Sequence, residues 1–427
     1  MAAAKGPPPT RTHTNKPQRT PQPILNTRHQ YPPRTHMTEK KQGILNQGLT
    51  VMTVSHTLTH VFNGIHTAIF SLLRDEFNLT LQQLGIIAAI PPLIDTIIAI
   101  PAGLITDKIG SRKMLLLSFA FAAAGAILAG FATGPVMLVA AICLIYINTT
   151  IYHPAAYSYT TRIFRRGDRS KALGLHGAGG TLGYAMGPLA VSILVGILAW
   201  QWRQVYLALA APMIIGIIMV LRLKEEEQAK PDTQTPDEPG DSQKLLTPNM
   251  IMFLIYSALR SMGGSMIGTF LVIYLQDTRS MTIAAAGLIS STTTLTGLIA
   301  APIGGVMAAR LGDKRWLETS LLAAFIILGL SFNSPSNTLF TLLYVTYGFF
   351  GTLGMAARSS IMATLSPRRQ RGLGYSLFFL PGSIVGAIAP IIAGTLAQSL
   401  GYTTIFNLAL AINFGALAVL RFAVKIE

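Results

Sequence analysis

One carboxyl group interrupts a long apolar segment early in the sequence. Asp95 lies in the stretch IIAAIPPLIDTIIAIPAGLI, where every other side chain is uncharged. Placing a charged side chain at the centre of a bilayer costs about 2.5–3.5 kcal/mol, and such residues usually face a protein interior or a water-filled cavity. Burial favours the neutral form of an acid, whereas a nearby guanidinium favours the charged form. We therefore predict that Asp95 binds and releases a proton as its surroundings change. The alternative is a buried acid that is permanently paired.

Two arginines interrupt apolar segments in the second half of the chain. Arg260 and Arg358 carry guanidinium groups, which stay charged and bind a carboxylate or phosphonate through two parallel hydrogen bonds. We predict that they bind an anionic part of a small-molecule substrate or pair with Asp95. The alternative is that they bond to groups within their own half of the protein.

A polar face runs along the first apolar segment. His56, His60 and Asn63 follow each other at helical spacing. Two histidines four residues apart can chelate zinc, but a third ligand of certain proximity is lacking. We favour a polar lining of a substrate cavity and predict no metal site; a metal-ion transporter that uses His56 and His60 is the less favoured alternative.

A second polar face occurs in the fourth apolar segment. Tyr146, His153 and Tyr157 lie at helical spacing there. They form either an aromatic wall for a substrate or ordinary packing with satisfied hydroxyl groups.

The composition indicates the elements that must position these residues. Of 427 residues, 51% are hydrophobic and 12% are charged, whereas soluble domains carry roughly 25% charged residues. Twelve apolar stretches each approach the ~20 residues that a bilayer requires. The fold class that follows is an all-α membrane protein with twelve transmembrane helices. The net charge of +16 does not indicate nucleic-acid binding, because basic residues gather in the cytoplasmic loops of membrane proteins.

The distribution of the 33 Lys and Arg residues predicts the topology. If the N-terminus lies inside, 28 of them fall in inner segments and three, Arg74, Arg203 and Arg279, fall in outer loops. This asymmetry places both termini in the cytoplasm, in a multi-pass protein of the cell membrane.

Four parts follow along the chain. Residues 1–45 are basic and Pro-rich, so we expect a disordered cytoplasmic tail, and translation could start at Met1 or at Met37. Residues 46–222 and 249–427 are expected to form two six-helix bundles. Residues 223–248 form a linker whose central part, residues 224–244, is charged and contains three prolines, which predicts a flexible cytoplasmic segment.

The loop between the second and third apolar segments is repeated later in the chain. IPAGLITDKIGSRK at residues 100–113 has a counterpart, APIGGVMAARLGDKR, at residues 301–315. Gly103 and Gly110 match Gly305 and Gly312 at an offset of 202 residues, but the acid Asp107 is replaced by Ala309. The same offset relates other glycines and prolines, so the two bundles descend from one unit. Such repeats place the substrate site at their interface near the middle of the bilayer.

The first copy of this loop resembles the signature between helices two and three of the major facilitator superfamily. Its residues are Gly103, Asp107, Lys108, Gly110, Arg112 and Lys113. Gly183, Gly187 and Pro188 resemble a motif common in exporters of that superfamily. The segments HVFNGI, IYHPAA and GAGGTLGYAMGPL are similar to the fosmidomycin-resistance type of efflux protein, although that subgroup usually has an acid where this chain has Gly64.

The resemblance implies a pseudo-symmetric pair of bundles that transports by alternating access. It implies a conformational latch, in which Asp107 binds the N-terminus of helix eleven on the cytoplasmic side. The function expected is proton-coupled efflux of small amphiphilic or anionic compounds, and the alternative is proton-coupled import of a small organic anion or nutrient. We expect a monomer in the lipid bilayer, with protons and a small molecule as ligands and no cofactor. An intramembrane enzyme is disfavoured because the chain lacks a constellation such as His-Glu-x-x-His, and an ATP-driven pump is disfavoured because it lacks a phosphate-binding-loop motif.

Overall fold

The computed structural model describes residues 47–163, 166–223, 246–365 and 371–426, together with residues 2 and 6. Residues 43–427 form one compact unit. Its first half contains α1 (Gln47–His60), α2 (Ile65–Ala68), α3 (Phe70–Phe77), α4 (Leu81–Ile109), α5 (Ser111–Gly130), α6 (Pro135–Ile163), α7 (Arg166–Ala190), the π-helical turn η1 (Val191–Ile197) and α8 (Trp202–Leu221). Its second half contains α9 (Pro248–Asp277), α10 (Ile283–Leu295), α11 (Gly297–Leu311), α12 (Asp313–Phe332), α13 (Asn337–Leu353), α14 (Met355–Leu365), α15 (Arg371–Leu400), α16 (Tyr402–Ala418) and η3 (Val419–Ala423).

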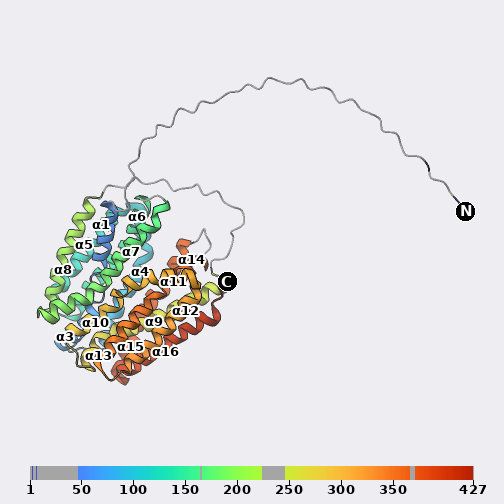
Figure 1. Ribbon diagram of the computed structural model, residues 1–427. Coiled ribbons are helices and arrows are strands. Elements are labelled where there is room, and N and C mark those ends of the chain that lie inside the picture. The colour runs from blue at the N-terminus through green and yellow to red at the C-terminus, as the bar shows by residue number, and fades with distance from the viewer. Residues whose placement is uncertain are drawn as a thin grey trace. The chain divides into compact units, whose positions relative to one another are not determined.

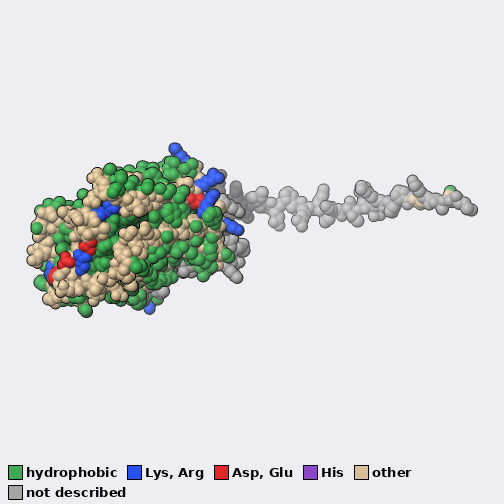
Figure 2. Space-filling model, turned by 90° about the horizontal axis from the view of Figure 1, so that it is seen from below, with side chains coloured by type: hydrophobic (Ala, Val, Ile, Leu, Met, Phe, Trp, Pro, Cys, Tyr) green, Lys and Arg blue, Asp and Glu red, His purple; other side chains and the backbone are tan. Residues whose placement is uncertain are grey.

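The helices have the length and the apolar composition of membrane-spanning segments. In the described part of the chain, 11 helical segments are long and apolar enough to cross a bilayer. The helices of the first half lie together on one side of this unit, and those of the second half lie on the other (Figure 1). Hydrophobic side chains dominate the face shown in Figure 2, and charged ones gather toward its two ends. The prediction of an all-α membrane fold is therefore confirmed.

The first predicted span differs from the prediction, because it is not one continuous helix. It is divided into α1, α2 and α3, and none of these reaches the length of a bilayer. The chain turns at Gly64, whose φ of +81° is a left-handed conformation that glycine adopts without strain. This break explains why 11 rather than twelve helical segments of the described chain are long and apolar enough to cross a bilayer.

Contacts between the halves follow the 202-residue repeat. A Cβ atom built on Gly85 of α4 would lie 2.4 Å from the carbonyl oxygen of Pro390 in α15. In the equivalent position, a Cβ atom on Gly287 of α10 would lie 2.8 Å from the carbonyl oxygen of Pro188 in α7. The two glycines are 202 residues apart, and so are the two prolines, so the two contacts are related by pseudo-two-fold symmetry. The halves pack there through small residues that allow close backbone approach.

The duplicated loop fastens the last helix of each half. Gly110 and Gly312 both have left-handed φ values, +88° and +86°, where the chain turns between two helices. Two residues later, the Arg112 guanidinium donates a hydrogen bond of 2.5 Å to the Leu221 carbonyl at the end of α8. Lys314, the equivalent residue, donates to the carbonyls of Arg421 (3.1 Å) and Val424 (2.7 Å) after α16. Basic groups at these helix ends satisfy carbonyls that lack helical partners.

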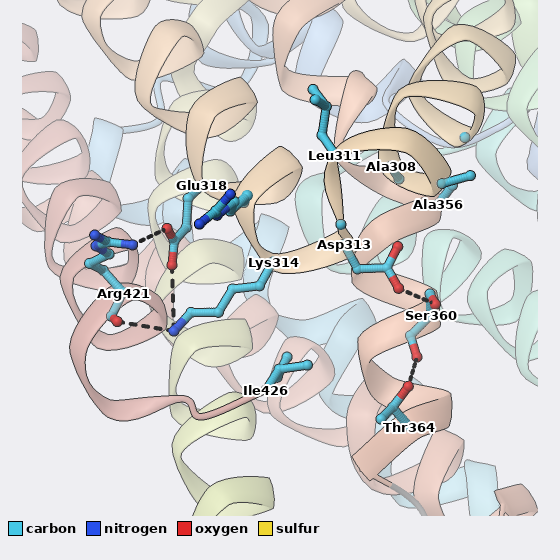
Figure 3. Close-up of a pocket in the computed structure, with 14 residues that line it drawn as sticks. Ala308, Leu311, Asp313, Lys314, Glu318, Ala356, Ser360, Thr364, Arg421 and Ile426 are labelled. Carbon is cyan, nitrogen blue, oxygen red and sulfur yellow. Dashed lines mark hydrogen bonds and ion pairs between the residues drawn. The ribbon is translucent and has the colours of Figure 1, made fainter.

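A second acid, Glu318, lies within a helix long enough to span a bilayer and was not singled out from the sequence. It lies in α12, where its side chain is buried and faces a pocket of about 910 Å³ (Figure 3). Its carboxylate is 3.0 Å from Arg421 Nη1 and 3.6 Å from Lys314 Nζ. Two cations compensate this acid, so it stabilises the end of its own bundle.

An ion pair fixes the start of α8 to α3, and it gives a testable pH dependence. Arg203 Nη2 lies 2.5 Å from Glu76 Oε1, and Trp202 Nε1 donates to Glu76 Oε2 at 2.8 Å. The hydrogen bond from Arg203 lowers the pKa of Glu76. A carboxyl with a lowered folded-state pKa stabilises the fold above its unfolded pKa of about 4.3 and loses that contribution as the pH falls below this value. We therefore expect Glu76→Gln to lower the unfolding temperature at neutral pH and to match wild type under strongly acidic conditions. Asp75→Asn, at a more exposed neighbour, is the control, and a pH-independent difference for Glu76→Gln would contradict the assignment.

The predicted division into tail, two bundles and linker stays a prediction. Residues 7–46 and 224–245, which hold most of the tail and of the linker, lie outside the described residues.

Candidate functional site

Asp95 lies on the face of α4 that approaches the second half. Pro92, one turn earlier on the same face, lies 3.7 Å from a Cβ position built on Gly386 of α15. Thr150 of α6 donates a hydrogen bond to Asp95 Oδ1. His153 follows Thr150 by three residues, which makes the two neighbours on the surface of α6. The acid is partly buried. It lies beside a polar group of α6 and one turn from a contact between the halves.

The arginines do not pair with Asp95 in this conformation. Among the described residues, Asp95 forms its hydrogen bond with Thr150. Arg260 stays within its own half, where Nη1 lies 3.4 Å from Asn413 Oδ1 and the guanidinium stands 5.4 Å from the centre of the Phe325 ring. Arg358 is partly buried in α14, also in the second half. Arg260 and Arg358 thus both lie in the second half, whereas Asp95 lies in the first.

His56, His60 and His153 form a compact cluster. Their Nε2 atoms are separated by 3.1 Å (His56 to His60), 3.3 Å (His60 to His153) and 3.4 Å (His56 to His153). His56 is 5% exposed and His60 is 2% exposed. In this conformation His56 and His60 are buried and their rings face one another inside the first half, and their role in lining a substrate cavity stays a prediction.

The glycines of α7 bring the cluster together. A Cβ atom on Gly180 would lie 2.5 Å from the His56 ring, and one on Gly183 would lie 2.4 Å from the Thr57 carbonyl oxygen. A Cβ atom on Gly187 would lie 2.0 Å from the Asn63 carbonyl oxygen, beside the break in the first span. Pro188 follows and contacts Gly64. The residues of the exporter-like motif thus allow α7 to cover the histidines and to hold the broken first span in place.

Other polar residues surround the cluster. Asn63 Nδ2 lies 3.3 Å from His60 Nδ1. Tyr184, which the sequence analysis did not select, stacks on the His60 ring at 4.1 Å, and the His176 ring stacks on His56 at 4.0 Å. Tyr157 is exposed and its ring centre is 6.3 Å from that of His153. Tyr146 lies a turn before Thr150, and its carbonyl oxygen is 3.0 Å from the Thr150 hydroxyl oxygen. The helical spacing of Tyr184 from Gly180 on α7 was the signal that could have identified it.

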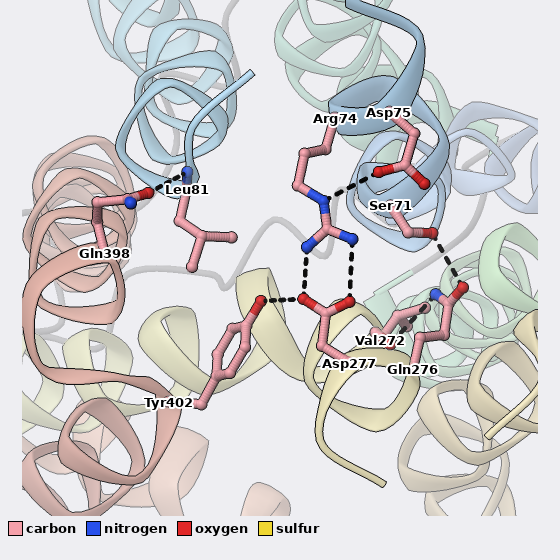
Figure 4. Close-up of polar contacts among 9 residues, drawn as sticks. All are labelled: Ser71, Arg74, Asp75, Leu81, Val272, Gln276, Asp277, Gln398 and Tyr402. Atoms are coloured by element: carbon pink, nitrogen blue, oxygen red, sulfur yellow. Dashed lines mark hydrogen bonds and ion pairs between the residues drawn. The ribbon is translucent and has the colours of Figure 1, made fainter. Parts of the chain in front are cut away.

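A second polar site joins the two halves at one end of the bundle (Figure 4). Arg74 of α3 binds Asp277 of α9 through two contacts, of 2.5 Å and 3.0 Å. The hydrogen bond with Asp277 raises the pKa of Arg74. Tyr402 donates to the same carboxylate at 2.8 Å, and Ser71 donates to Gln276 at 2.9 Å. From the sequence, Arg74 counts only as a charge of an outer loop, and that charge alone gives no sign of this network.

The predicted latch falls largely on residues that the structure does not describe. The surroundings of Gly103, the side chain of Asp107 and those of residues 371–379 at the start of α15 lie outside what the structure describes. Lys108 is exposed, and Gly110 and Arg112 act at the turn and at the end of α8 as described above. The contact between Asp107 and α15 therefore stays a prediction.

The fold and the site define a multi-pass membrane protein of the transporter type. The features that indicate this class are the broken first span, the glycine-lined contacts between symmetric halves and the polar groups near their interface. The profile of the Major Facilitator Superfamily matches residues 52–258 and 253–426. The chain belongs to this superfamily, as the motif of the duplicated loop indicated.

Curated relatives and solved structures agree with this assignment. The fosmidomycin resistance protein of Escherichia coli (strain K12) is 25% identical over 368 residues, which cover 83% of this chain and 88% of that protein. A probable nitrate transporter of Staphylococcus epidermidis, NarT, is 22% identical and covers 89% of this chain and 96% of that protein. A crystal structure of a bacterial homologue of the human lysosomal transporter Spinster superposes with a TM-score of 0.75 at 16% identity, over 88% of this chain and 96% of that chain. These comparisons establish the fold and a membrane transporter family.

Proposed function

We propose that this protein is a secondary transporter that couples the movement of protons to the efflux of small amphiphilic or anionic compounds. Residues 46–222 and 249–423 would rock against each other around a central site in the cell membrane, with both termini in the cytoplasm. The observation that carries the proposal is the position of Asp95, a partly buried acid on α4 one turn from the interhalf contact of Pro92. The similarity to a protein named for fosmidomycin resistance supports efflux.

The surroundings of Asp95 link it to the movement of the halves. Its carboxylate bonds to Thr150 of α6, within the first half. When the halves move, α4 shifts against α15, and the solvation of the acid changes with that shift. A carboxyl group whose burial changes between two conformations binds a proton in one and releases it in the other, which is the requirement for coupling.

A second candidate is import of a small anion with a proton. Arg260 and Arg358 place two cationic side chains in α9 and α14, on the opposite half from Asp95. A relative named as a probable nitrate transporter is consistent with an anionic substrate. In this alternative the arginines bind the substrate, and Asn63, Tyr146 and Tyr157 line the facing side.

The test is flux through the purified full-length protein in liposomes under an imposed pH gradient. Asp95→Asn removes the titratable group and keeps the size and the hydrogen-bond acceptor for Thr150. We expect gradient-driven flux to fall to the level of empty liposomes, while exchange of substrate for substrate continues because it requires no net proton movement.

Thr96→Ser is the matched control, since Thr96 is the next residue of α4 and bonds only to the Pro92 carbonyl among the described residues. The direction of the flux separates efflux from import. If Asp95→Asn transports as wild type under the gradient, Asp95 is not the proton carrier and the proposal is refuted.

A further inference from the structure

The three clustered histidines have the spacing of a metal site. Zinc–nitrogen bonds of about 2.0–2.1 Å at tetrahedral angles place two ligand nitrogens about 3.3–3.4 Å apart. The three Nε2 separations of 3.1, 3.3 and 3.4 Å approach this value on every edge of the triangle. We infer that His56, His60 and His153 together bind a divalent zinc ion through their Nε2 atoms.

The hydrogen bonds on the far side of the rings support this inference. His56 Nδ1 lies 2.7 Å from the His176 carbonyl oxygen, and His153 Nδ1 lies 2.7 Å from the Thr149 carbonyl oxygen. A carbonyl accepts, so both Nδ1 atoms must donate, and in neutral rings both Nε2 atoms then carry lone pairs. These lone pairs face each other at 3.4 Å. A cation between them removes the repulsion, and a carbonyl behind each ring is the usual outer partner of a histidine that binds a metal.

Asn63 completes the outer partners. Its side-chain amide lies 3.3 Å from His60 Nδ1, and in the orientation that presents Oδ1 it accepts the proton of that nitrogen. All three rings then direct an Nε2 lone pair into the same space. His56 and His60 lie on α1 and His153 lies on α6. Gly180 and Gly183 of α7 allow that helix to pack closely on α1.

The triangle also selects the metal. In a square-planar site, which suits Cu²⁺ and Ni²⁺, any three of the four ligand nitrogens include one pair on opposite sides of the metal. The nitrogens of that pair are about 4 Å apart. The longest of the three separations is 3.4 Å. Among the described residues no fourth histidine, cysteine or carboxylate joins the group, so water or a small ligand takes the remaining tetrahedral position, as in other three-histidine zinc sites.

The experiment measures zinc binding rather than transport, so it does not depend on the proton-coupled function. Full-length protein without a polyhistidine tag is stripped with a chelator, and Zn²⁺ is titrated against a chromophoric competitor. Zinc held by His13, His29 and His36, which lie outside the described residues, is measured in a His56→Ala/His60→Ala variant and subtracted. We expect one further zinc ion per wild-type chain, and tetrahedral Co²⁺ absorption when cobalt replaces zinc.

Three variants test the assignment. His153→Ala should lose this zinc ion, whereas Asn63→Ala should bind it about 10–100-fold more weakly, because an outer partner is lost. His66→Ala is the matched control, since His66 is a buried histidine of the same span outside the cluster. Zinc should raise the unfolding temperature of wild type and His66→Ala but not of His153→Ala, which separates ligand loss from misfolding. Absence of zinc binding in wild type, or equal affinity in wild type and His153→Ala, overturns the inference.

Discussion

Replacing Gly187 by alanine is expected to destabilise the protein strongly. The added Cβ atom would lie 2.0 Å from the carbonyl oxygen of Asn63 and 3.0 Å from that of Val61. Both contacts are with backbone, which cannot move away as a side-chain end could. Overpacking of this kind costs about 1–3 kcal/mol and occasionally more. We expect a lower unfolding temperature and a smaller monodisperse fraction of purified protein.

Gly177→Ala is the matched control on the same helix. A Cβ atom at Gly177 meets nothing within 4 Å. Alanine is favoured over glycine in a helix by about 0.8–1.0 kcal/mol, so this variant should be as stable as wild type or more stable. The two substitutions add the same methyl group to α7 and should act in opposite directions. If Gly187→Ala retains the wild-type unfolding temperature, the close approach of α7 to the break is not as described.

Neutralising Asp277 is expected to open the end of the bundle that the Arg74 pair closes. The carboxylate accepts both contacts from Arg74 and the hydroxyl of Tyr402. Both side chains of the ion pair are largely covered, with 29% and 26% of their surface exposed. Hydrogen bonds to charged groups contribute about 1.5–3 kcal/mol, and one or two kcal/mol changes a population by about 5–30-fold.

The measurement is the rate of maleimide labelling of Ser71→Cys in a Cys143→Ser background, with purified protein in detergent. Ser71 is 6% exposed beside Gln276, so it reports on closure of this end. Asp277→Asn should accelerate labelling, and the charge swap Arg74→Asp/Asp277→Arg should restore slow labelling. Asp75→Asn is the control, because that carboxylate contacts the same arginine at 3.2 Å but is 70% exposed. Fast labelling in the charge-swapped variant would show that the pair does not hold the halves together.

Much of the fold could be predicted because it depends on composition and on the repeat. Long apolar segments need only their length to indicate helices, and the 202-residue offset indicated two halves that descend from one unit. The same offset relates Asp75 to Asp277 and could have drawn attention to the outer network. The offset could not show that Arg74 binds Asp277 of the other half, because that ion pair depends on how the two halves pack together.

The candidate site was harder to predict because its residues are distant in the sequence. His56 and His60 lie one turn apart, but the third histidine is 93 residues from His60. Spacing predicts neighbours on one helix and says nothing about which faces of two helices meet. The break at Gly64 was missed for a related reason, since the adjacent apolar residues favour a continuous helix and the constraint comes from Gly187 and Pro188 of α7.

The paired caps of Arg112 and Lys314 have a consequence for biogenesis. Each cation lies in the first turn of a helix, α5 or α12, of the same half whose final helix it secures. The ribosome releases the first half while the second is still being synthesised, and domains generally fold as units from the N-terminus. We therefore expect the first six segments to reach their native packing in the translocon before the partner repeat exists, with assembly of the pair as a later docking step.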